Sequence, residues 1–155
     1  MFSIEETKAI KQEFWVKFGQ MSAQKRIAYG LSKKWMLHKT GISQVSLKFE
    51  LTRKVALVAI DINSKDVKER LLLFEKFESL KSIINSEFEG GMEWDFTHLT
   101  DENRELSRIS YHLNRVSILN KNDWPVIFNF LFDNMLKVEY IIHDYSDYLQ
   151  SNINE

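Results

Sequence analysis

The residues best suited to bind a ligand lie in one basic segment between residues 25 and 39. Cations attract phosphate groups without regard to sequence, and aromatic rings stack on exposed bases. We therefore expect this segment to contact single-stranded or distorted nucleic acid, with an acidic protein as the other partner that its charge would suit. The candidate binding residues are Lys25, Arg26, Lys33, Lys34, Trp35 and Lys39.

The distribution of charge along the chain supports this choice of segment. The net charge is −1, yet residues 1–54 carry eleven Lys or Arg against four Glu, and the remainder carries ten against eighteen acids. No acid occurs between Glu13 and Glu50. Two outcomes stay open: the cations gather on the surface, or they fold against the acidic remainder and are neutralised.

A second and weaker set of candidate residues would suit a small metal-dependent nuclease-like enzyme. Asp61, with Glu50 and Lys65 nearby in the sequence, resembles the acids and lysine that nucleases place around a metal on adjacent strands. The spacing departs from that pattern, because no lysine lies two positions after Asp61 and Glu50 should lie at the far end of the hairpin. We expect Asp61 to end a strand, and the nuclease remains the enzymatic alternative.

The sequence predicts no cofactor and no metal site. It has no phosphate-binding glycine loop, zinc-protease helix motif, calcium loop or nucleophile elbow. It has no Cys, and its four His are spread without ligand spacing.

The first half of the chain predicts a helix followed by a hairpin. Ser3 and Glu6 match a capping box, and the apolar spacing that follows gives about five helical turns to Met21. Residues 22–41 are expected to be irregular or in a short helix. Alternation from Val45 to Leu51 predicts a strand with one wet face, and the wholly apolar run 55–60 predicts a central strand covered on both faces, with the first helix on the second face.

The second half predicts a helix, a second hairpin and a last helix. We expect Asn63 or Ser64 to cap the earlier helix, and Asp123 to cap the later one with Pro125 in its first turn. The expected elements are a helix that ends before Gly90-Gly91, strands at 92–97 and 107–113, a short extra strand at 116–118, and a helix from 124 to about 149.

This order, α-ββ-α-ββ-α, predicts an α+β fold. Hairpins pair antiparallel and amphipathic helices pack on a sheet, so we expect a two-layer sandwich with about four strands and three main helices. Residues 1–155 should form a single domain with its core at about 3–149. The chain shows no apolar run long enough to span a bilayer and no secretory signal, so we expect no membrane contact and a cytoplasmic location.

The last helix raises the question of self-association. Its apolar seam should pack on the sheet, but Phe130, Ile141 and Tyr148 fall on roughly the opposite side. If they form an exposed stripe, they are the contact of a homodimer or of a purely structural homo-oligomeric subunit. If the helix curves around the sheet, the same residues are hidden; both outcomes stay open.

Several short motifs resemble one bacterial family, the domain of unknown function numbered 4268. The resemblance runs over about residues 10–145 and is carried by Phe14-Trp15, Trp35 with Lys39-Thr40-Gly41-Ile42, Val58-Ala59-Ile60-Asp61, Ser107-Arg108-Ile109 and Asp123-Trp124-Pro125. His38 stands where the family is expected to have Tyr.

The family has no established activity, and similar domains sometimes follow nuclease-like regions in longer restriction or defence proteins. This chain shows no such region, so the resemblance implies an accessory module that stands alone and is associated with nucleic acid. The sequence thus favours a non-catalytic binding or interaction module whose contact surface is the basic segment 25–39.

Overall fold

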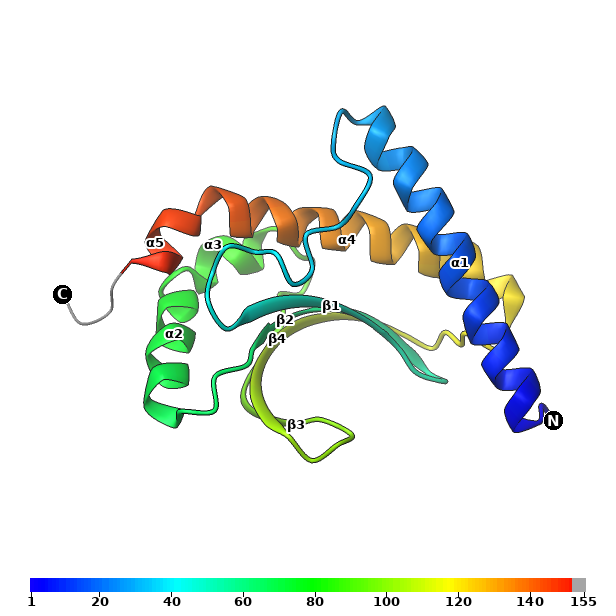
Figure 1. Ribbon diagram of the computed structural model, residues 1–155, viewed down its shortest axis with the longest axis horizontal. Coiled ribbons are helices and arrows are strands. Elements are labelled where there is room, and N and C mark those ends of the chain that lie inside the picture. Colours follow the sequence, from blue (N-terminus) through cyan, green and yellow to red (C-terminus); the bar gives the residue numbers. More distant parts are fainter. Residues whose placement is uncertain (152–155) are drawn as a thin grey trace.

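The computed structural model describes residues 1–151 and has the α+β architecture that the sequence predicts (Figure 1). Within this range the helices are α1 (Ile4–Ala28), α2 (Val67–Ser79), α3 (Lys81–Ser86), a 3₁₀ turn η1 (Lys121–Asp123), α4 (Trp124–Asp144) and α5 (Ser146–Gln150). The strands are β1 (Val45–Leu51), β2 (Val55–Ile62), β3 (Glu93–Leu99) and β4 (Glu105–Asn114).

In this part of the chain the strands form one antiparallel sheet in the order β1-β2-β4-β3. The two predicted hairpins, β1–β2 and β3–β4, are joined because β2 pairs with β4, from Val55 opposite Asn114 to Ile62 opposite Ser107. β2 is therefore a central strand, as its unbroken apolar run indicates. The register of β3 with β4 shifts between Asp95 and His98, which twists this edge of the sheet.

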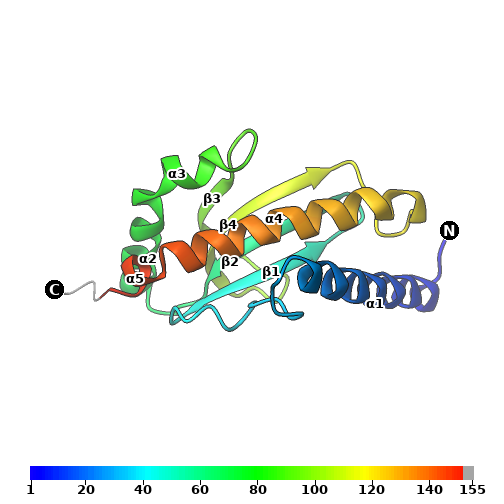
Figure 2. The same cartoon turned by 90° about the horizontal axis from the view of Figure 1, so that it is seen from above.

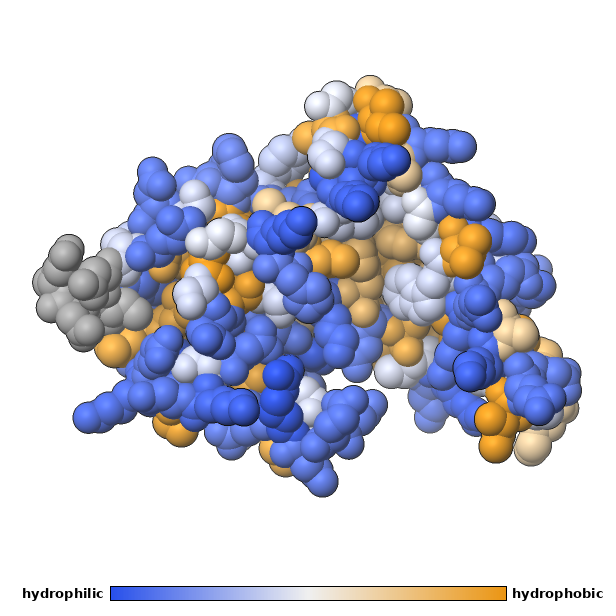
Figure 3. Space-filling model, in the orientation of Figure 1, coloured by the Kyte–Doolittle hydropathy of each residue, from blue (hydrophilic) through white to orange (hydrophobic). Residues whose placement is uncertain are grey.

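The sheet is strongly curved, and the long helix α4 and the helix α2 lie on its convex side (Figure 1). The predicted seam of α4 packs there, and Leu131, Met135, Val138 and Ile142 are fully buried against strand residues such as Val58 and Ile60. We call the other side of the sheet the concave face. Figure 3 shows a mainly hydrophilic surface that is hollowed between the β3–β4 end of the sheet and α1.

Helix α1 differs from its prediction in length and in position. It continues to Ala28, two turns beyond Met21, so the first cations of the basic segment are helical. Its buried rings Phe14 and Phe18 contact Phe128 of α4 and Phe49 of β1. The side chain of Phe49 is on the convex side of the sheet, because Phe49 lies opposite Val58. α1 thus lies beside the β1 edge (Figure 2) and does not cover the concave face.

The burial of β2 on its concave side has another cause. Ala59 is small and lies in register between Lys48 and Ser110, while Asp61 is held in an ion pair with Arg108. Neighbouring side chains on the concave face thus cover β2, in place of a helix.

Several predicted boundaries are also corrected. Asp66 caps α2 by accepting hydrogen bonds from the backbone amides of Lys68 and Glu69, because Asn63 and Ser64 still belong to the preceding connection. The helix that was predicted to run unbroken to the glycines is interrupted at Leu80: α2 ends at Ser79, and the short α3 begins at Lys81.

Around the last helix, residues 116–118 are not a strand. Asp123 occupies the N-cap position of α4, as predicted, but its side chain makes no capping hydrogen bond. The carboxylate of Asp123 instead accepts a hydrogen bond from the backbone amide of Ser117 at 2.9 Å. The helix breaks at Tyr145, so that α4 and α5 replace one continuous helix.

The residues proposed for a dimer contact do not form an exposed stripe. Ile141 is only 6% exposed, and Phe130 is half-buried and stacks on Tyr111 of β4 with ring centroids 5.7 Å apart. Tyr148 alone is exposed, at 43%. Among residues 1–151, no helix combines the length and apolar character needed to cross a membrane.

Candidate functional site

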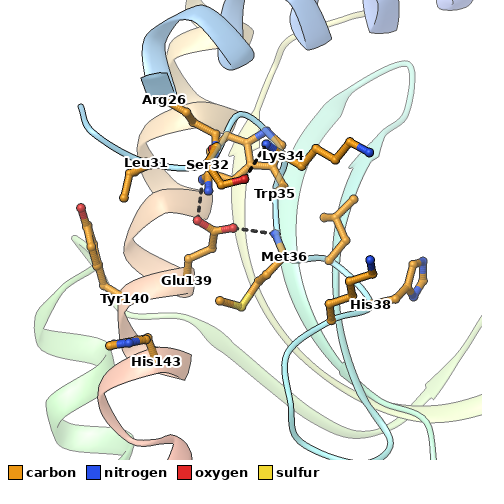
Figure 4. A pocket seen from close by; sticks show the side chains of 12 residues that line it. Arg26, Leu31, Ser32, Lys34, Trp35, Met36, His38, Glu139, Tyr140 and His143 are labelled. Carbon is orange, nitrogen blue, oxygen red and sulfur yellow. Dashed lines mark hydrogen bonds and ion pairs between the residues drawn. The ribbon is translucent and has the colours of Figure 1, made fainter. Parts of the chain in front are cut away.

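A pocket of about 720 Å³ lies between α4 and the loop that follows α1 (Figure 4). One wall is formed by the loop segment 31–39, and the other by Tyr140 and His143 of α4. We call this the first pocket. Its apolar lining comes from Leu31, Trp35, Met36 and Leu37, and its polar groups from Arg26, Ser32, Lys34, His38, Lys39 and Glu139.

A buried ion pair holds the two walls of the first pocket together. Nη1 of Arg26, near the end of α1, lies 2.5 Å from Oε1 of Glu139 on α4, and both side chains are less than 10% exposed. The other carboxylate oxygen of Glu139 accepts a hydrogen bond from the backbone amide of Met36 at 2.8 Å. Nε of Arg26 donates to the carbonyl of Ser32 at 2.7 Å. These bonds fix the path of the loop segment 31–39.

Trp35 is built into the inner wall of this pocket. The guanidinium of Arg26 lies over its ring at 4.4 Å from the centroid, and the ring packs edge-on against Phe49 and Phe132. Its indole nitrogen donates to the hydroxyl of Ser22 at 3.3 Å. Trp35 is half-buried, so part of the ring remains available at the pocket surface.

The structure separates the cations of the basic segment into two groups. Arg26 is withdrawn into the ion pair with Glu139, and Lys25 lies 4.0 Å from Asp133 and over the ring of Phe132. The remaining cations are exposed and form no ion pair within residues 1–151: they are Lys33, Lys34 and Lys39. The open basic surface is therefore smaller than the sequence predicts and is centred on the loop segment 31–39.

Sequence reasoning missed the residues that α4 contributes. Three residues of α4 lie at least one hundred residues beyond the basic segment, and no motif connects the two regions: they are Glu139, Tyr140 and His143. One signal was present, since Glu139 interrupts a helix whose buried face is otherwise almost wholly apolar. A lone acid at such a position indicates a buried cationic partner.

On the concave face, the residues of the nuclease alternative form a different arrangement from the one that a metal site needs. Asp61 binds Arg108 through both carboxylate oxygens, at 2.7 and 3.0 Å, and Glu50 binds the same guanidinium at 2.8 Å. Glu50 and Asp61 do lie at different ends of the hairpin, opposite Leu57 and Ser46, but Arg108 reaches both. Lys65 is exposed in the connection to α2 and is not part of this cluster.

The charge of Arg108 is stabilised by these carboxylates. Burial alone would lower the pKa of Arg108, but the hydrogen bond to Asp61 and the charges of Asp61 and Glu50 outweigh burial and raise the pKa above its ordinary value. The guanidinium therefore occupies the place between the two carboxylates that a metal would need. Residues 1–151 contain no cluster of three or more His, Asp or Glu side chains that could hold a metal ion.

The structure is thus of the α+β class, and its first pocket has apolar walls with Lys34 and Lys39 in its lining. Residues 10–146 match the family described as Domain of unknown function (DUF4268), and the chain belongs to this family. A search of curated proteins gave no match, and a search of solved structures gave none either.

Proposed function

We propose that this domain is a non-catalytic module that binds single-stranded nucleic acid at the rim of the first pocket. One observation carries the proposal: three lysines of the loop segment 31–39, at positions 33, 34 and 39, are exposed and form no ion pair in the described part of the chain. Lys34 and Lys39 line the first pocket together with Trp35, and Lys33 is next to Lys34 in the chain.

The chemistry of this rim suits a single strand. Lysines bind phosphate oxygens without fixing a base, and unpaired bases offer flat apolar faces for a pocket of aromatic and aliphatic side chains. A duplex hides its bases and would use only the lysines. We place this activity in the bacterial cytoplasm, where single-stranded nucleic acid is present.

The test compares the wild-type protein with the triple variant Lys33→Glu, Lys34→Glu and Lys39→Glu in fluorescence anisotropy with labelled oligo-dT and oligo-rU. We expect wild-type binding to weaken as salt rises, and the variant to lose at least tenfold in affinity at low salt, since each reversed charge replaces an attraction by a repulsion. Circular dichroism should show an unchanged fold because all three side chains are exposed.

A matched control separates local contacts from net charge. Lys8, Lys11 and Lys54 are also exposed and lie outside the first pocket, so reversing these three changes the net charge by the same amount. We expect this control to bind within about threefold of the wild type, as long-range charge effects are screened in salt. The proposal is wrong if the wild type binds neither oligonucleotide, or if the control loses as much affinity as the loop variant.

The nuclease alternative makes a different prediction about the concave face. A nuclease would cleave oligonucleotides with magnesium or manganese and lose that activity in Asp61→Ala. Because Asp61 is bound through both oxygens to Arg108, we expect Asp61→Ala to lower the stability of the protein. We expect the wild type itself to show no cleavage with either metal.

A further inference from the structure

A second pocket adjoins the first one across the edge of β1. It has a volume of about 370 Å³, and Leu37 and His38 line both pockets. Beyond these shared residues the second pocket continues past Ser46 and Lys48 of β1 toward Asp61 of β2, so that it wraps from the sheet edge onto the concave face. The two pockets therefore meet at Leu37 and His38.

The loop segment that borders the two pockets is attached to the edge of the sheet. The backbone amide of Leu47 donates to the carbonyl of Leu37 at 2.9 Å, which attaches the loop segment 31–39 to the outer edge of β1. With the ion pair of Arg26 and Glu139 at the other side, the loop is fixed at two points. Two of its residues, Leu37 and His38, border both pockets.

The second pocket repeats the chemistry of the first. Lys48 and Arg104 are exposed and form no ion pair within the described residues, and Arg104 donates to the side-chain oxygen of Asn63 at 3.3 Å. The half-buried ring of Trp15 forms part of the wall. The one acid in the lining is Asp61, whose two oxygens are both engaged by Arg108.

We infer that the strand bound at the first pocket continues over the β1 edge at His38 into the second pocket, where Lys48 and Arg104 bind its phosphates. This inference rests on the proposed function and extends the site to several nucleotides. Cations placed along a path, with a tryptophan in each pocket, suit a polyanion with regularly spaced phosphates and bases. A free nucleotide or inorganic phosphate would occupy one pocket alone and gain nothing from the other.

The experiment measures how affinity depends on strand length. Labelled oligo-dT of about 3, 6 and 12 nucleotides covers the range of site sizes known for single-strand binding folds. We expect the affinity of the wild type to rise with length by more than tenfold. In the double variant Lys48→Glu with Arg104→Glu, the longest strand should bind as weakly as the shortest.

Salt dependence gives an independent readout. Each lost phosphate contact on a single strand lowers the slope of log affinity against log salt by about 0.7, so the variant with both cations neutralised to Gln should lose about 1.4. The control double variant Lys8→Glu with Lys11→Glu, on exposed positions of α1 outside both pockets, should keep the length dependence and the slope.

The failure of this inference differs from the failure of the proposed function. If charge reversal at Lys34 and Lys39 abolishes binding while the Lys48 and Arg104 variants leave length dependence unchanged, the site ends at the first pocket and the inference is overturned. If no oligonucleotide binds but poly-glutamate does through the same four cations, the partner is an acidic protein, and both proposals are wrong.

Discussion

The ion pair between Arg26 and Glu139 is the residue-scale feature on which the candidate site depends. Removing one partner leaves the other charge buried, and loss of the Glu139 carboxylate also leaves the amide of Met36 without its acceptor. We expect Glu139→Ala and Arg26→Met each to lower the free energy of unfolding by about 3 kcal/mol. In urea denaturation, the double variant should lose less unfolding free energy than the sum of the two single variants. The difference, which is the coupling energy of the pair, should be about 2 kcal/mol. Additive costs would show that the pair does not act as a unit.

Arg108 plays the corresponding part on the concave face. Its partner Asp61 has a side chain that is 5% exposed, whereas that of Glu50 is 29% exposed. Because water screens the second pair more strongly, Asp61→Asn should destabilise the protein by about 3 kcal/mol and Glu50→Gln by about 1 kcal/mol. Thermal or urea unfolding at neutral pH measures both, and equal effects would contradict this ranking.

At the scale of elements, the connection from α3 to β3 depends on two glycines with left-handed backbone. Gly90 and Gly91 have φ of +80° and +76°, and a Cβ at Gly91 would also lie 3.2 Å from the side chain of Asn85. That side chain accepts hydrogen bonds from the amide of Met92 and the indole of Trp94. We therefore expect Gly90→Ala to cost about 1 kcal/mol and Gly91→Ala about 2 kcal/mol or more in unfolding free energy. A smaller cost at Gly91 than at Gly90 would show that Asn85 moves without penalty.

At the scale of the whole molecule, we propose that the chain is a single domain in which α1 belongs to the common core. Phe14 and Phe18 pack against α4 and β1, so α1 should not unfold separately. We expect urea transitions followed by tryptophan fluorescence and by far-ultraviolet circular dichroism to coincide. Phe14→Ala should shift both together, by about 3 kcal/mol, because it leaves a cavity between the two helices. Separate transitions would mean that α1 is an independent unit.

Much of the fold could be predicted because its signals are local. Three patterns can be recognised within short stretches of sequence: the alternation from Val45 to Leu51, the apolar run of β2 and the apolar seam of α4. The breaks inside the predicted helices were missed, since they fall at residues such as Leu80 and Tyr145, which do not signal a helix end as Gly or Pro would. The predicted position of α1 was also wrong. The apolar face of α1 could pack on either face of the sheet, and its sequence does not say which one.

The candidate site divides in the same way. The sequence by itself determined that the cations are concentrated between residues 25 and 39 and that Trp35 lies among them. Only the tertiary structure decided which of them are open to a ligand, because the partner of Arg26 is 113 residues away on α4. It also brought Glu50 and Asp61, 58 and 47 residues from Arg108, onto one guanidinium. Ion pairing depends on distance in space, and that distance is set by how the sheet curves and where the helices pack on it.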